Sequence, residues 1–131
     1  MIGVDTNILV RSVTGDDQRR TPIARQFLTE RTPDNPAVVN VVVLAEFVWT
    51  MRTKYSADRN EIIELLDNIV GNDGFHILHR EPVLIALQDY RDGIGSFTDV
   101  LIAQLNAEAG CATTMTFDKQ ASTQGSFTRL A

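Results

Sequence analysis

Four acidic residues have the side-chain type and the placement that metal chemistry needs: Asp5, Glu46, Asp99 and Asp118. Each lies close to the end of a segment whose apolar pattern predicts a strand or within the first turns of a predicted helix. Four carboxylates in one cleft repel one another, so without a cation some of them would hold protons at neutral pH. Hard ions such as Mg²⁺ and Mn²⁺ prefer carboxylate and water oxygens. If the four acids meet, they indicate a site for these ions.

Each acid also has an ordinary structural explanation. Most Asp and Glu side chains are solvated surface charges, and Asp99 at a predicted helix start would also serve as a cap. An acid such as Asp5, at the end of a buried strand, is costly without a partner, while Glu46 has mostly apolar helical neighbours. The histidines His76 and His79 lack the spacing of a zinc-binding helix motif. Spacing alone therefore leaves a metal site and separate surface charges both open.

Strands and helices alternate in the elements that must position these acids. This order predicts an α/β fold, a three-layer α/β/α domain over residues 1–131 with a mainly parallel sheet of about five strands. In such a sheet, ligands bind beyond the carboxyl ends of the strands. The expected strands are residues 2–4, 37–39, 75–78, 111–115 and 127–130. The expected helices are residues 7–13, 17–31, 41–54, a segment from a cap at Ser56 or Asp58 to Gly71, residues 82–90, and a segment from Thr98 or Asp99 to Gly110.

The same pattern predicts the surroundings of several single side chains. Asn40 is expected to cap the helix at residues 41–54, and Trp49 within that helix is expected to pack in the core. Cys111 is expected to be a small buried residue. The inner face of the helix at residues 17–31 is expected to carry Ile23, Ala24, Phe27 and Leu28.

Composition limits the class of protein. With 131 residues, of which 44% are hydrophobic and 22% charged, the chain is expected to form one globular domain. No run approaches the roughly 18 apolar residues of a membrane span, no secretory signal is recognised at the start, and the lone cysteine fits a reducing cytoplasm. The net charge is −5, from 12 basic and 17 acidic residues. Bound cations would offset the four acids, so charge neither excludes nor supports a nucleic-acid partner.

Four short stretches, in order, resemble PIN-domain proteins, and VapC-type toxins in particular. They are VDTNILVR from Val4, LAEFVW from Leu44, FTDVLIA from Phe97 and TFDK from Thr116, and together they span residues 4–119. The resemblance implies a PIN fold and a cytoplasmic ribonuclease toxin of a type II toxin–antitoxin pair that depends on Mg²⁺ or Mn²⁺. It also implies a homodimer, and an inhibitory VapB-like antitoxin whose tail blocks the active site.

The resemblance assigns roles to individual residues. The family's acidic ligands carry over to Asp5, Glu46, Asp99 and Asp118, and the expected reaction is hydrolysis of an RNA phosphodiester by a metal-activated water. Asp5 and Asp118 are expected to be direct ligands, with the other two completing the set. Supporting positions fall on Thr6, Asn7 and Thr116. Phosphate contacts by Arg11, Arg52, Lys54 or Lys119, and base stacking by Trp49 or Tyr55, remain open beside purely structural roles.

Two other functions are compatible with parts of this pattern. An aspartate-nucleophile phosphatase also has an acid at the end of its first strand, but usually a second Asp two residues later, where this chain has Asn7. A non-catalytic PIN-fold module that binds RNA or protein is the other alternative. Intact acids at all four positions argue against loss of activity.

Overall fold

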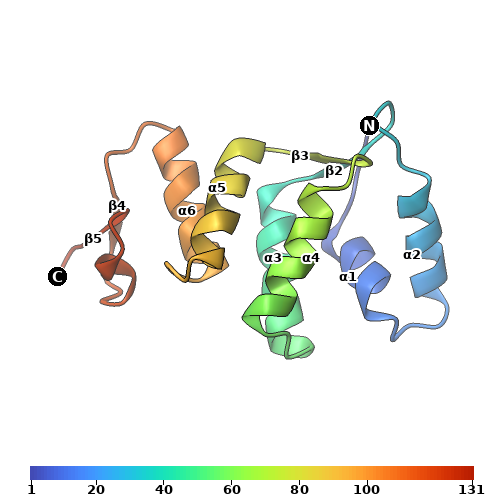
Figure 1. Cartoon of the computed structure of the whole chain (residues 1–131), viewed down its shortest axis with the longest axis horizontal. Coiled ribbons are helices and arrows are strands. Elements are labelled where there is room, and N and C mark those ends of the chain that lie inside the picture. The colour runs from blue at the N-terminus through green and yellow to red at the C-terminus, as the bar shows by residue number, and fades with distance from the viewer. The chain divides into compact units, whose positions relative to one another are not determined.

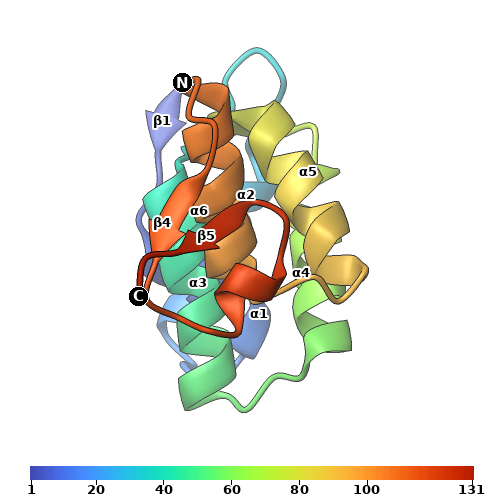
Figure 2. The same cartoon turned by 90° about the vertical axis from the view of Figure 1, so that its left-hand side faces the viewer.

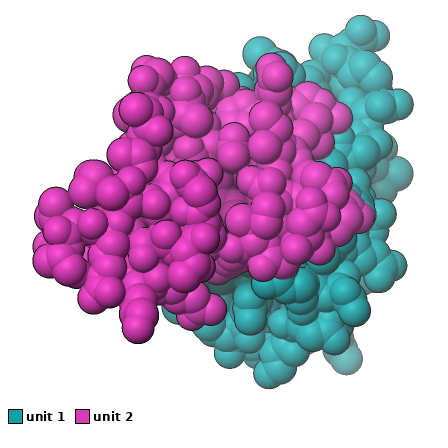
Figure 3. All heavy atoms as spheres, turned by 60° about the vertical axis from the view of Figure 1, so that its left-hand side comes forward, with its two compact units in different colours: residues 1–78 teal, residues 79–131 magenta.

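The computed structural model describes residues 1–131, and the chain divides into two compact units, Met1–Leu78 and His79–Ala131 (Figures 1 and 3). The first unit contains a three-stranded parallel sheet in the order β1-β2-β3. In register, Ile2 lies opposite Ala37, and Ala37 lies opposite Phe75. The strands are β1 (Ile2–Gly3), β2 (Ala37–Val39) and β3 (Phe75–Ile77).

Four helices complete the first unit, and polar side chains cap three of them. Asn40 Oδ1 accepts from the Val43 N–H at 3.0 Å, and Asp58 forms a capping box with Glu61. Asp5 caps the first helix, which ends at Gly15 in the left-handed conformation (φ 67°) that favours glycine. The helices are α1 (Thr6–Thr14), α2 (Arg20–Thr29), α3 (Val41–Lys54) and α4 (Arg59–Val70). The largest fully buried side chains of these elements are Leu9, Val39, Leu44, Phe47, Ile62 and Leu66.

The second unit combines two packed helices with a two-stranded parallel sheet. Tyr90 and Phe97, at the facing ends of the helices, meet edge to face with ring centroids 6.0 Å apart. Figure 2 shows the two strands side by side, with Thr114 opposite Phe127 in register. Ala103, Ala121 and Phe127 form a small buried cluster. The elements are α5 (Arg80–Arg91), α6 (Phe97–Glu108), β4 (Thr114–Thr116), the 3₁₀ turn η1 (Ala121–Thr123) and β5 (Phe127–Arg129).

The α/β class predicted from the sequence is confirmed. All five expected strands are present and every strand pair is parallel, with three strands in the first unit's sheet and two in the second's. The strand at residues 37–39 and the helix at residues 41–54 have the predicted bounds. No helix of the structure is both long and apolar enough to cross a membrane.

Three predicted boundaries were wrong. The helix expected at residues 17–31 runs from Arg20 to Thr29, because residues 18–19 form a turn before it. The last long helix is capped by Ser96, whose hydroxyl accepts from the Asp99 N–H at 3.1 Å, and not by Thr98 or Asp99. The fourth strand begins at Thr114, because the chain turns at residues 109–110 after α6 and bends again at residue 112. Cys111 lies between this turn and the bend and is exposed, not buried.

Three predictions of burial were also wrong. Trp49 is 57% exposed, because the buried side of α3 is formed by Leu44, Phe47 and their neighbours on the opposite face. Ile23 is 62% exposed, because only Thr21 and Ala24 of α2 are fully buried. The first strand is an edge strand with both residues exposed, and Val4, just after it, is the buried residue.

Candidate active site

Asp5 lies at the carboxyl end of β1 and begins α1. The Val4 N–H donates to the Val38 carbonyl oxygen at 3.2 Å, so Asp5 follows directly after the paired part of the sheet. One carboxylate oxygen, Oδ1, accepts from the Thr6 N–H at 2.7 Å, which orients the side chain at the helix N-terminus. The second oxygen has no protein partner. This carboxylate is exposed, so it is available to a ligand.

Glu46 lies on the exposed side of α3, in the second turn after the Asn40 cap. Among its apolar helical neighbours, Phe47 is fully buried on the core side, whereas Val42 and Trp49 are exposed. The Glu46 carboxylate is exposed and makes no hydrogen bond or ion pair. The apolar surroundings noted in the sequence therefore do not bury the acid.

Asp99 is the third residue of α6 and is half-buried. Because the Ser96 hydroxyl caps this helix, the Asp99 carboxylate is not needed as the cap. Its place in the first turn favours a negative charge, since the N-terminal end of a helix carries partial positive charge. The Asp99 carboxylate therefore lies at a helix start, and its oxygens have no protein partner.

Asp118 follows β4 and organises the turn before η1. Oδ1 accepts from the N–H groups of Gln120 and Ala121 at 2.8 and 3.2 Å. The Asp118 N–H in turn donates to the Thr116 hydroxyl at 3.0 Å, so Thr116 supports the backbone that carries the acid. The other carboxylate oxygen, Oδ2, has no protein partner, and the side chain is exposed.

The four acids share a chemistry that fits a divalent cation. None forms an ion pair, as is true of most acids of this chain; the ion pairs involve Asp16, Asp17 and Glu108. Each keeps at least one oxygen without a protein partner. Carboxylate oxygens that are not paired with a basic side chain suit Mg²⁺ or Mn²⁺ better than zinc. Asp5 and Glu46 belong to the first unit, and Asp99 and Asp118 belong to the second. Neither unit by itself brings together three His, Cys, Asp or Glu side chains that could hold a metal ion.

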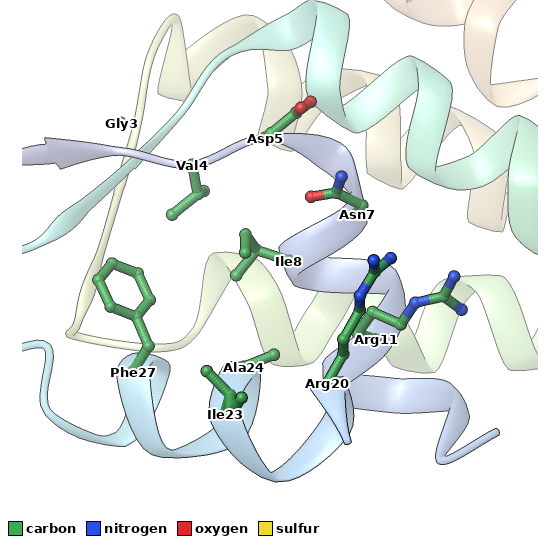
Figure 4. Close-up of a pocket in the computed structure, with 10 residues that line it drawn as sticks. All are labelled: Gly3, Val4, Asp5, Asn7, Ile8, Arg11, Arg20, Ile23, Ala24 and Phe27. Atoms are coloured by element: carbon green, nitrogen blue, oxygen red, sulfur yellow. The ribbon is translucent and has the colours of Figure 1, made fainter. Parts of the chain in front are cut away.

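A pocket of about 600 Å³ lies between α1 and α2 and includes Asp5 in its lining. Figure 4 shows Arg11 and Arg20 next to each other on one side of this pocket, with Phe27 and other apolar side chains on the other. The carboxylate of Asp5 points away from this apolar wall. Asn7, one of the expected supporting residues, is exposed and also lines the pocket, whereas Thr6 is buried.

The two arginines of this pocket differ in their partners. Arg11 Nη1 lies 3.3 Å from Asp16 Oδ1, and Arg11 Nε lies 3.8 Å from Asp17 Oδ2. The Arg20 guanidinium is exposed and forms no ion pair. Arg20 is thus the freer of the two cations that line this pocket, and the sequence did not single it out because nothing in its spacing separates it from Arg19.

The loop that follows α1 contacts both Tyr55 and Arg11. The Tyr55 hydroxyl donates to Asp16 Oδ2 at 2.7 Å. This bond, followed by the bond from Thr14 and the charge of Arg11, holds the pKa of Asp16 below its usual value. The pKa of Asp17 is also lowered, mainly by the hydrogen bond from the Arg20 N–H. These contacts favour structural roles for Tyr55 and Arg11 over base stacking and phosphate binding.

Comparison with known proteins identifies the family to which this chain belongs. The PIN domain family matches residues 2–125, nearly the whole chain, so the chain belongs to the PIN-domain family. PIN domains are in general metal-dependent nucleases that use divalent metals. A search of curated proteins finds no match to this chain.

Proposed function

We propose that this PIN-domain protein is a ribonuclease toxin of a toxin–antitoxin module, dependent on Mg²⁺ or Mn²⁺. The observation that carries the proposal is the state of Asp5, Glu46, Asp99 and Asp118. All four occupy the positions of the PIN-like motifs, and all four leave carboxylate oxygens free of cationic partners. The toxin role rests on the resemblance of the motifs to VapC-type toxins. With that role we propose a cytoplasmic homodimer and a VapB-like antitoxin as partner.

The chain's own residues would prepare the ligands. Asp5 and Asp118 would bind the ion directly, and Glu46 and Asp99 would complete the set. The Thr6 N–H orients Asp5 and the Thr116 hydroxyl orients the Asp118 backbone, so each acid is positioned before a ligand arrives. When bound, the divalent ion supplies an activated water for hydrolysis of the RNA phosphodiester.

A carboxamide series tests the four ligands. Asp5→Asn, Glu46→Gln, Asp99→Asn and Asp118→Asn each remove one charge at nearly constant volume. Because loss of a group that merely orients a ligand costs about 10–100-fold, loss of a ligand should reduce RNA cleavage by at least about 100-fold. The measurement is the initial rate of cleavage of a labelled RNA with Mn²⁺.

Matched acids elsewhere in each unit provide the control for this series. Asp34→Asn in the first unit and Glu81→Gln in the second change exposed acids outside the motifs. Both should keep the wild-type rate and the wild-type melting temperature. Wild-type cleavage by all four ligand variants would refute the assignment of the acids.

The toxin role has its own test in cells. Expression of the wild-type chain in a bacterium should arrest growth, and co-expression of the small protein encoded beside it should relieve the arrest. Asp5→Asn should permit normal growth at the same protein level. Arrest by Asp5→Asn equal to wild type would contradict a toxin that acts through RNA cleavage.

A further inference from the structure

The exposed side of α3 carries an aromatic side chain one turn from a proposed metal ligand. Residues three or four apart lie on the same face of a helix, so Val42, Glu46, Trp49 and Thr53 form one stripe along α3. All four are exposed. Trp49 is therefore placed beside Glu46 and not behind it in the core.

The contacts of Trp49 reveal no structural role for this side chain in the first unit. Its indole is 57% exposed and takes no part in an aromatic pair or a cation–π contact; those present involve Tyr90 with Phe97 and Arg31 with Phe27. The core side of α3 is complete without it, because Phe47 and Leu44 are fully buried on the opposite face. A large flat apolar ring is thus presented to a ligand beside an acid of the site.

We propose that Trp49 binds substrate by stacking on an unpaired base of single-stranded RNA held at Glu46. This inference rests on the ribonuclease function proposed above and adds the form of RNA that the site accepts. Aromatic side chains bind single strands in this way because every base has a flat π-face, so stacking needs no particular sequence.

The charges of α3 favour RNA over a protein as the ligand of this stripe. Arg52 and Lys54 lie in the last turn of the same helix, and both are exposed. Arg52 is three residues from Trp49 and so lies on the same side of the helix. A cation on that side suits a phosphate backbone whose bases stack on the ring. The other aromatic residue near this end of α3, Tyr55, is half-buried and its hydroxyl is bound to Asp16, so it does not compete for the role.

Fluorescence tests the proposal directly, because Trp49 is the only tryptophan of the chain. A short single-stranded RNA is titrated into the full-length Asp5→Asn variant with Mg²⁺, in which the RNA should stay uncleaved. Stacking of a base on the indole should quench the Trp49 emission in a saturable manner. An abasic ribose-phosphate oligomer of equal length carries the same charge without bases and should leave the emission nearly unchanged.

Two substitutions measure what the ring contributes to binding. Trp49→Leu keeps an apolar side chain but removes the aromatic face, and it should weaken RNA binding about 5- to 150-fold, the equivalent of about 1–3 kcal/mol per stacked base. Trp49→Phe should recover much of the affinity. Leu84→Ala, at an exposed apolar residue of α5, is the matched control and should bind as wild type. Affinity is followed by the anisotropy of a labelled RNA, which does not depend on the tryptophan.

Three results would overturn the proposal. One is the absence of quenching by RNA at concentrations where anisotropy shows binding, and another is equal quenching by the abasic oligomer. The third is a Trp49→Leu variant with unchanged RNA affinity; an altered oligomeric state in that variant would make the stripe a protein interface. Failure of the ribonuclease function is seen separately, as absence of RNA cleavage by the wild-type chain, whatever the fluorescence shows.

Discussion

Two sets of acidic side chains in this chain differ in their partners. Asp16 and Asp17 are tied to Arg11, Tyr55 and backbone N–H groups, which hold the pKa of both below the usual value. The four motif acids have no cationic partner. The first group is tied into the loop after α1, whereas the second has the unpaired carboxylates that the proposed metal site requires. The identity of the motif acids was readable from the sequence, but their free state was not, because an ion pair depends on which side chains the fold brings together.

The bond between Tyr55 and Asp16 makes a prediction about pH. Tyr55→Phe removes the largest cause of the lowered pKa, so the pKa of Asp16 should rise toward its usual 3.8. Because the folded-state pKa lies below the unfolded one, this group stabilises the fold above about pH 4 and loses that effect as pH falls through the folded-state pKa. The measurement is a titration of the side-chain carboxyl signals by NMR.

The pKa of Asp17 is the internal control for this titration. The main cause of the lowered Asp17 pKa is the hydrogen bond from the Arg20 N–H, which Tyr55→Phe leaves in place. The Asp17 pKa should therefore stay lowered in the variant. An unchanged Asp16 pKa would show that the Tyr55 hydroxyl does not stabilise this carboxylate.

At the level of helices and strands, local sequence was most informative where a cap and an apolar stripe coincide. Asn40 before a run of apolar residues located α3 correctly. The start of α6 was misplaced because Ser96, Thr98 and Asp99 are all good capping residues, and the bond that selects Ser96 is visible only in the structure. The exposure of Trp49 was also missed, since a helix that is apolar on most sides does not reveal which side packs inward.

The capping box of α4 predicts the stability effect of one substitution. Asp58→Ala removes the acceptor of the Glu61 N–H, which lies 2.9 Å from Asp58 Oδ1. The free energy of unfolding should fall by about 1 kcal/mol, within the range of about 0.5–2 kcal/mol for lost caps. Urea denaturation followed by circular dichroism measures it. Asp34→Ala, at an exposed loop residue, should change stability by less than about 0.5 kcal/mol, and equal losses in the two variants would argue against the cap.

For the whole molecule, the proposed metal binding links the excess of acidic charge to stability. The net charge is −5, and the four motif acids contribute most of the excess over a balanced chain. The PIN family match over residues 2–125 makes a divalent metal the expected counter-charge. The sequence predicted the fold class and the four acids through ordered motifs. The grouping of strands into a three-stranded and a two-stranded sheet could not be predicted, because strand pairing depends on contacts distant in sequence.

This coupling predicts that divalent ions stabilise the protein. A ligand that binds only the folded state adds about 2.7 kcal/mol at a free concentration 100 times its Kd. The melting temperature of the wild-type chain should rise with Mg²⁺ or Mn²⁺, and that of Asp5→Asn should rise less at the same concentration. Calorimetry in a metal-free buffer supplies the reference. Identical shifts in the two proteins would indicate that ions bind elsewhere.

The most direct measurement is cleavage of RNA by the purified, antitoxin-free chain. With Mg²⁺ or Mn²⁺ the wild-type protein should cut a single-stranded cellular RNA, EDTA should stop the reaction, and excess Mn²⁺ should restore it. Asp118→Asn, prepared in parallel, should remain inactive throughout and so exclude a contaminating nuclease. If the wild-type chain cuts no cellular RNA with either ion, or cuts equally well in EDTA, the chain is not the metal-dependent ribonuclease proposed from its four acids.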